Sequence, residues 1–148
     1  MTYNFKFQKI LDLKEREKDE AFSKYQESVQ KFEVYAEKLF ELLKKKEDLE
    51  KLQLQQISTG LSVMEIRHNQ SFILNLQKTI DHYQRLVINA RNTMNFREEQ
   101  LKESNIEMKK YEKMKEKSYK YYLKMVDKIE NIRLDEFASQ QYFHRGER

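Results

Sequence analysis

The sequence predicts an all-α protein: one long antiparallel two-helix coiled-coil hairpin, with its bend near Gly60 and a second helix longer than the first. Three observations support this fold class. The 148 residues include no proline and only two glycines, so few turns interrupt the chain. Charged residues make up 36% of the chain, and apolar residues recur at regular intervals between them. Between two long segments with regular apolar spacing lies one short stretch whose residues are typical of the end of one helix and the start of the next.

The second helix is expected over about residues 62–141, where apolar residues follow a seven-residue repeat. Ten of the twelve residues at seven-residue intervals from Ile66 are apolar: Ile66, Ile73, Ile80, Val87, Met94, Leu101, Met108, Tyr122, Ile129 and Phe143, with Lys115 and Glu136 as the exceptions. A second row, which starts at Asn69 and includes Leu76 and Tyr83, mixes apolar and polar residues. Two such rows form the seam of a coiled coil.

The first helix is expected over about residues 3–57, and it carries rows of the same kind. One row includes Leu11, Tyr25, Phe32 and Leu39; a second includes Ala21, Tyr35, Leu42 and Leu49; a third adds Phe22, Val29, Ala36 and Leu43. Three apolar rows make a stripe that is too wide for a helix to leave in water. The first helix must therefore pack against another part of the protein or a partner.

The turn between the helices is expected at about residues 58–61. Gly60 can adopt the left-handed conformation that ends many helices. Ser62 and Glu65 form an S-x-x-E capping box, in which the serine hydroxyl accepts a hydrogen bond from the amide three residues on. A short connection of this kind makes two helices antiparallel neighbours.

The two helices have unequal lengths. Residues that face each other across the hairpin should have numbers that add up to about 121, so residues beyond about 118 lack a partner helix. The apolar pattern continues along this overhang, in Tyr119, Tyr122, Met125, Val126, Ile129, Ile132, Phe137 and Phe143. An exposed apolar surface of this size marks an interaction site. Three interpretations stay open: an external partner, self-association of two copies, or a kink that folds the overhang back.

Composition argues against catalysis, cofactors and metals. The chain has no cysteine, which removes disulfides and thiolate ligands and fits a reducing, cytoplasmic compartment. None of the three histidines has another histidine three or four residues away, and no phosphate-binding loop occurs. No apolar run is long enough for a membrane span, and the N-terminus lacks a signal-peptide core. We therefore expect no enzyme activity, no cofactor and no membrane-spanning segment.

Lysines concentrate in residues 109–124, which hold seven lysines against two glutamates. Three interpretations stay open for this segment: a solvated helix face, a site for an acidic protein surface, or a site for nucleic acid. The last is the weakest, because arginine clusters and stacking platforms are missing, so nucleic acid is not among the expected partners.

Two segments resemble the flagellar export protein FliJ family and, by extension, the stalk proteins of type III secretion. They are the N-terminal Phe5-Lys-Phe-Gln-Lys-Ile-Leu-Asp-Leu-Lys-Glu and the stretch Arg67-His-Asn-Gln-Ser-Phe-Ile-Leu-Asn-Leu-Gln-Lys-Thr-Ile80. The resemblance implies a non-enzymatic stalk similar to the two-helix stalk of the rotary ATP synthase. Implied partners are a hexameric flagellar export ATPase, the cytoplasmic domain of an export-gate membrane protein, and export chaperones. The implied location is cytoplasmic, peripheral at the cytoplasmic face of the cell membrane.

The resemblance also suggests two binding sites. The export-gate patch of the family maps to Leu42, Leu49, Phe72, Leu76, Thr79 and Tyr83. The candidate ATPase contact is the overhang, with Tyr119, Tyr122, Met125, Ile129 and Ile132. Most of the gate candidates fall on seam rows, where packing is the default role, whereas Phe72 lies just outside both rows. The alternative function is a generic coiled-coil adaptor or structural spacer, with homodimerisation through the overhang as one form of it.

Overall fold

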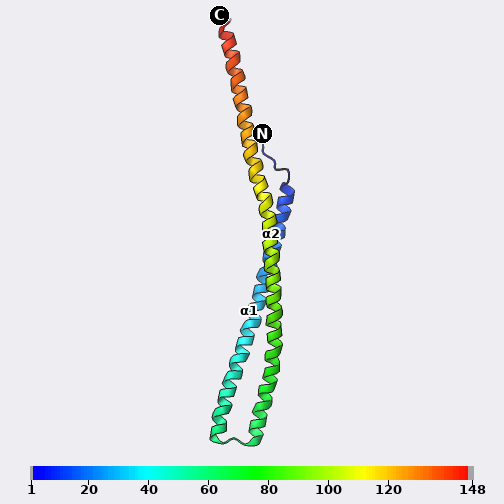
Figure 1. Cartoon of the computed structure of the whole chain (residues 1–148), viewed down its shortest axis with the longest axis vertical. Helices are drawn as coiled ribbons and strands as arrows, with labels where there is room; N and C mark the ends of the chain where they lie inside the picture. Colours follow the sequence, from blue (N-terminus) through cyan, green and yellow to red (C-terminus); the bar gives the residue numbers. More distant parts are fainter. Residues whose placement is uncertain (1, 147–148) are drawn as a thin grey trace. The chain divides into compact units, whose positions relative to one another are not determined.

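The computed structural model describes residues 2–146 and contains two α-helices (Figure 1). Helix α1 covers Gln8–Thr59, and α2 covers Val63–Gly146, so they have 52 and 84 residues. No strand occurs in the described residues. The expected all-α fold, with a second helix longer than the first, is confirmed.

Contacts divide the chain into two compact units. The bend unit is Asp19–Lys102, and the terminal unit combines the described residues of Met1–Lys18 and Glu103–Arg148. Each unit contains one stretch of α1 and one stretch of α2. Each is described by itself below, and the interpretation of residues 1–148 as one continuous hairpin domain stays a prediction.

The seam of the bend unit follows the seven-residue repeat position by position. Every residue of the two central rows of each helix is buried or half-buried: Ala21, Tyr25, Ser28, Phe32, Tyr35, Leu39, Leu42, Lys46, Leu49, Gln53 and Gln56 on α1, and Ile66, Asn69, Ile73, Leu76, Ile80, Tyr83, Val87, Ala90, Met94, Arg97 and Leu101 on α2. Ile80 is fully buried. Ser28 is 5% exposed, and its hydroxyl donates a 2.6 Å hydrogen bond to the Tyr25 carbonyl on its own helix. This bond satisfies the one buried polar side chain of the unit.

Contacts between side chains at three levels of the bend unit show how α1 and α2 run relative to each other. The Lys46 ammonium donates to the Gln77 side-chain oxygen at 2.5 Å, and the Asn69 amide donates to the Gln56 side-chain oxygen at 3.3 Å. The Arg91 guanidinium lies 5.5 Å from the centre of the Phe32 ring, within the range of a cation–π contact. The two helices are antiparallel, because residue numbers rise on α2 as those of their partners fall on α1.

The turn consists of Gly60, Leu61 and Ser62. Gly60 has a φ of 91°, which is the left-handed conformation. The Ser62 hydroxyl accepts a 3.3 Å hydrogen bond from the Glu65 amide and so caps α2. The turn lies slightly later than residues 58–61, because the hydroxyls of Ser58 and Thr59 donate back to carbonyls of the preceding helical turn and α1 continues through both.

In the terminal unit, α1 begins at Gln8 rather than at residue 3. Residues 2–5 are non-helical, and the Tyr3 ring packs against Tyr119 and Tyr122 of α2 with centroid distances of 5.2 Å to each. The Tyr3 hydroxyl also donates a 3.3 Å hydrogen bond to the Lys115 carbonyl. Non-helical backbone lets this N-terminal segment run alongside α2 beyond the start of α1.

Helix α2 continues past this N-terminal segment to Gly146 (Figure 1). The last half-buried side chain along it is Val126, and every residue of 127–146 is exposed. We call residues 127–146 the overhang from here on. It begins later than the expected position near residue 118, because Tyr3 covers α2 as far as Tyr122. The helix is unbroken, so in the described residues the overhang does not fold back.

Candidate functional site: two partner-binding surfaces

The six gate candidates of the bend unit do not form one continuous exposed surface. Leu76 is only 8% exposed, and Leu42, Leu49 and Tyr83 are half-buried in the seam. Phe72 is 45% exposed, and Thr79 is also exposed. A partner that approaches this part of the hairpin therefore meets Phe72 and Thr79 first, while the other four side chains hold the two helices together.

Phe72 sits at the edge of the seam, where two helices contribute to its surroundings. The Lys45 ammonium of α1 lies 5.6 Å from the centre of the Phe72 ring. Phe72 and Leu49 also line a small hollow of about 80 Å³, together with Leu52, Gln53, Gln56, Asn69 and Ile73. The hollow combines apolar walls with amide groups, so it can accept an apolar side chain and satisfy a polar group beside it.

Thr79 lies one heptad after Phe72, on the same edge of α2. Its hydroxyl donates a 3.3 Å hydrogen bond to the Asn75 carbonyl of the preceding turn. The donor is therefore used within the helix, and the residue is exposed to solvent. This edge of α2 offers a partner an aromatic ring and, about two turns further on, a hydroxyl acceptor.

The five ATPase candidates lie in the terminal unit at the point where the seam loses its partner helix. Tyr122 is half-buried, whereas the exposed fractions of Tyr119, Met125, Ile129 and Ile132 are 46%, 41%, 36% and 49%. Tyr122, Met125, Ile129 and Ile132 are spaced three, four and three residues apart, so they extend the seam rows along one face of α2. That face is shaped to receive another helix, and in the overhang no segment of residues 2–146 covers it.

Sequence reasoning missed Tyr3, which shapes one end of this surface. Its ring packs between Tyr119 and Tyr122 and reduces what those two side chains offer a partner. A signal was present, because aromatic residues occupy positions 3, 5 and 7, and alternation with a period of two is typical of extended backbone rather than of helix. Because this segment was expected to be helical, its contact with α2 was not predicted.

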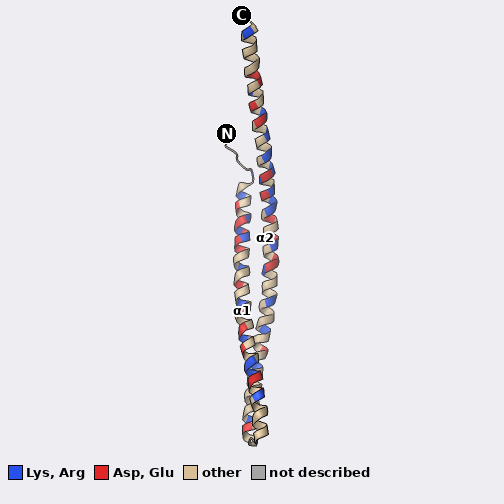
Figure 2. Cartoon of the chain, turned by 90° about the vertical axis from the view of Figure 1, so that its left-hand side faces the viewer, with Lys and Arg blue, Asp and Glu red and all other residues tan. Residues whose placement is uncertain are grey.

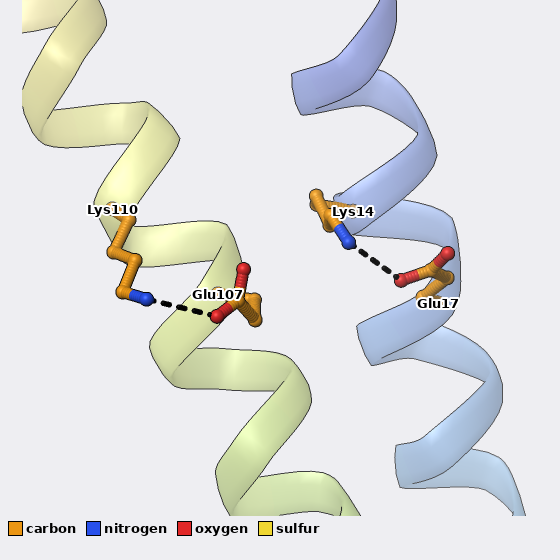
Figure 3. A network of polar contacts seen from close by, with 4 residues as sticks. All are labelled: Lys14, Glu17, Glu107 and Lys110. Atoms are coloured by element: carbon orange, nitrogen blue, oxygen red, sulfur yellow. Dashed lines mark hydrogen bonds and ion pairs between the residues drawn. The ribbon is translucent and has the colours of Figure 1, made fainter.

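Two ion pairs lie near each other in the terminal unit, and each is formed within one helix (Figure 3). Lys110 donates a 3.0 Å hydrogen bond to Glu107 on α2, and Lys14 forms a 3.5 Å ion pair with Glu17 on α1. The hydrogen bond and charge of Lys110 lower the pKa of Glu107 below its ordinary value of 4.5, and the charge of Lys14 on the other helix adds to this effect. Glu107 is therefore ionised at neutral pH.

The two candidate surfaces, one in each unit, offer groups that suit contact with another protein. Among residues 2–146, no group of three histidine, aspartate or glutamate side chains is arranged to hold a metal ion. Within the same residues, neither helix is both long and apolar enough to cross a membrane. What the side chains provide is apolar area, ring faces and charge on exposed helix faces, which are the elements of protein–protein recognition.

Comparison with known proteins relates nearly the whole chain to one family. A family model described as "Flagellar FliJ protein" matches residues 3–147. A relative from Bacillus subtilis (strain 168), also described as "Flagellar FliJ protein", is 48% identical over 146 residues, which cover 99% of each chain. A solved structure, described as a YscO homologue from Chlamydia trachomatis, matches with a TM-score of 0.69 and 18% identity over 99% of each chain. The identity to this structure is low, so this last match concerns the fold alone.

Proposed function

We propose, since this chain belongs to the flagellar FliJ protein family, that it is a stalk of the flagellar type III protein export apparatus and has no catalytic role. In this proposal its overhang binds the hexameric export ATPase, and the bend unit contacts the cytoplasmic domain of the export-gate membrane protein through Phe72. The protein then works in the cytoplasm, at the inner face of the cell membrane, and assists the delivery of substrates by export chaperones.

The single observation that carries the ATPase contact is the uncovered seam of the overhang. Ile129 and Ile132 of the overhang, and Met125 just before it, continue the rows that bury Met108 to 8% exposure within the same unit. Burial of apolar area stabilises association by about 25 cal/mol per Å² before the costs of binding are subtracted. A ring-shaped ATPase with an apolar collar around its pore would cover this face without any rearrangement of α2.

The gate contact rests on Phe72 and its surroundings. A half-exposed aromatic ring beside a small hollow is a typical anchor of protein interfaces, because its burial contributes much area at low conformational cost. Lys45 lies over the same ring and adds a positive charge at the rim. A partner with an acidic residue next to an apolar one would contact both the Lys45 ammonium and the Phe72 ring.

The ATPase contact can be tested with one pair of substitutions. Ile132→Asp places a charge on the uncovered seam, whereas Leu134→Asp places it two residues away on another face, where the side chain is 65% exposed. Binding to purified export ATPase is measured by analytical ultracentrifugation. We expect Ile132→Asp to weaken binding by at least about tenfold and Leu134→Asp by less than about threefold. Equal binding by both variants and the wild type would refute the contact.

One alternative function is supported by the same observation. Two copies can pair through their overhangs, because a row of apolar side chains spaced three and four residues apart is complementary to itself. The chain would then be a homodimeric adaptor or spacer. Sedimentation of the protein alone separates the two cases: a monomer at micromolar concentration supports the stalk, and a dimer that Ile132→Asp dissociates supports the adaptor.

A further inference from the structure

A row of lysines follows one outward face of α2 in the terminal unit. We call it the lysine stripe, and it consists of Lys110, Lys113, Lys117, Lys120 and Lys124. Their spacings of three, four, three and four residues place them above one another on a helix. All five side chains are exposed, and Figure 2 shows Lys and Arg recurring along this part of α2. At a rise of 1.5 Å per residue the stripe is about 21 Å long.

The stripe is poorly neutralised by the protein itself. Lys110 pairs with Glu107 at 3.0 Å, and Lys120 pairs with Glu116 at 3.4 Å. Among the described residues, the remaining three lysines of the stripe, Lys113, Lys117 and Lys124, form no ion pair. Each consecutive pair in the stripe places two positive charges three or four residues apart, which destabilises an isolated helix. The arrangement costs stability unless an anionic partner supplies the missing charge.

We propose that the lysine stripe is a docking surface for an acidic protein, one that presents carboxylates along a helix at matching intervals. This inference does not depend on the proposed ATPase or gate contacts, since the stripe lies on a different face of α2 from the seam. Charge complementarity carries the choice of partner, because three ammonium groups without an ion pair lie in one row on an exposed helix face and attract a row of carboxylates.

An anionic membrane fits the stripe less well than a protein does. A helix that lies on a bilayer inserts an apolar face between its rows of basic residues. In this unit the continuous apolar rows of α2 belong to the seam, which lies on a different face from the stripe, and Tyr3 packs there on Tyr119 and Tyr122. The apolar side chains that are exposed beside the lysines, such as Met114, Tyr121 and Leu123 at 42%, 66% and 44%, occur singly among charged residues.

Nucleic acid also fits less well. Glu112 and Glu116 flank the stripe and would lie close to phosphates along a uniformly charged backbone. No arginine occurs between Arg97 and Arg133, so the bidentate phosphate contacts that arginine makes are missing. A protein surface, in contrast, carries both signs of charge and can pair with lysines and glutamates together.

The test compares two triple variants of the full-length chain. Lys113→Glu, Lys117→Glu and Lys124→Glu together reverse the unpaired part of the stripe. The matched control reverses Lys24, Lys31 and Lys38, which are also exposed and form no ion pair among the described residues. Both variants change the net charge equally, so any effect of long-range attraction is the same in each.

The probe is a labelled helical peptide that carries five glutamates at the spacing of the stripe, with a peptide of the same composition in scrambled order as its reference. Binding is measured by fluorescence anisotropy at low ionic strength. We expect the stripe variant to bind the ordered peptide at least about tenfold more weakly than the wild type, and the control variant to lose less than about threefold. The wild type should also prefer the ordered peptide to the scrambled one.

The folding of the stripe variant is checked by its thermal melting. The row would then carry positive charge at positions 110 and 120 and negative charge at 113, 117 and 124. Three of its four consecutive pairs become attractive and one stays like-charged, so the melting temperature should change little. Equal loss of binding in the two triple variants would mean that net charge alone explains the effect. That result would overturn the proposal. Tighter binding of duplex DNA or of phosphatidylglycerol vesicles than of the ordered peptide, lost in the stripe variant, would also overturn it, because the partner would then not be a protein.

Discussion

The ammonium of Lys45 on α1 lies 5.6 Å from the centre of the Phe72 ring on α2. The pair joins the two helices of the bend unit at the edge of the seam, outside its central rows. Phe72 is 45% exposed, so the ring is shared between the protein and solvent. A cation–π contact at such an exposed site contributes about 0.5–1 kcal/mol. The ring is therefore of limited use for stability and well placed for a partner.

The first prediction concerns Phe72→Ala. We expect it to lower the free energy of unfolding by less than about 1.5 kcal/mol, since it removes a half-exposed ring and one weak contact. Urea denaturation of the full chain measures this change. The same variant should weaken binding to the export-gate domain in a titration. A loss of stability as large as that of a seam variant would show that Phe72 packs in the core and would contradict the assignment.

The second prediction concerns Ile80, the one fully buried large side chain among residues 2–146. Removing a buried isoleucine side chain costs about 2–5 kcal/mol, and an aspartate adds the cost of a carboxylate without a partner. We expect Ile80→Asp to melt the bend unit well below the wild type when followed by circular dichroism. Ile88→Asp is the matched control, because Ile88 is 59% exposed, and it should change stability by less than about 0.5 kcal/mol.

The seam was predictable residue by residue, and its flanks were not. A seven-residue repeat fixes which positions of a helix face its partner, so rows through Ile66 and Asn69 could be assigned from spacing alone. Which flanking residues meet depends on the register of the two helices. Sequence spacing indicated that Phe72 lies off the seam, but only the structure pairs it with Lys45.

The limits of the helices were harder to predict because hydroxyls and aromatic rings decide them. Ser58 and Thr59 were expected in the turn, yet their hydroxyls bond to carbonyls of the preceding helical turn and extend α1. Tyr3 was expected in a helix, yet its contacts with α2 hold the N-terminal segment in non-helical backbone. Both effects depend on local three-dimensional partners, which a period in the sequence does not reveal.

The third prediction concerns Gly60, whose φ of 91° lies in the left-handed region. A Cβ at this position would meet no atom within 4 Å, so any cost of Gly60→Ala arises from backbone conformation alone. The left-handed conformation costs an L-residue roughly 1–2 kcal/mol, and the stiffer unfolded chain offsets part of it. We expect Gly60→Ala to destabilise the hairpin by about 1 kcal/mol in urea denaturation.

Two variants control for this interpretation. Gly60→Asn should cost less than Gly60→Ala, because asparagine tolerates the left-handed conformation better than alanine. Gly146→Ala changes the other glycine, which has open space around it and no left-handed φ, and should be close to neutral. If Gly60→Ala proves stabilising, the turn does not hold this conformation in solution.

The last prediction concerns the titration of Glu107. The Lys110 hydrogen bond and charge, followed by the charge of Lys14, lower the pKa of this carboxyl below 4.5. A pKa that is lower in the folded state stabilises the fold above the unfolded pKa, and this contribution is lost as the pH falls through the folded pKa. NMR titration of the Glu107 carboxyl carbon should therefore give a midpoint below 4.5. Lys110→Ala should move the midpoint up towards 4.5, and Lys14→Ala should move it less, since Lys14 contributes only long-range charge. A larger effect of Lys14→Ala would mean that the two helices approach more closely here than the structure has them.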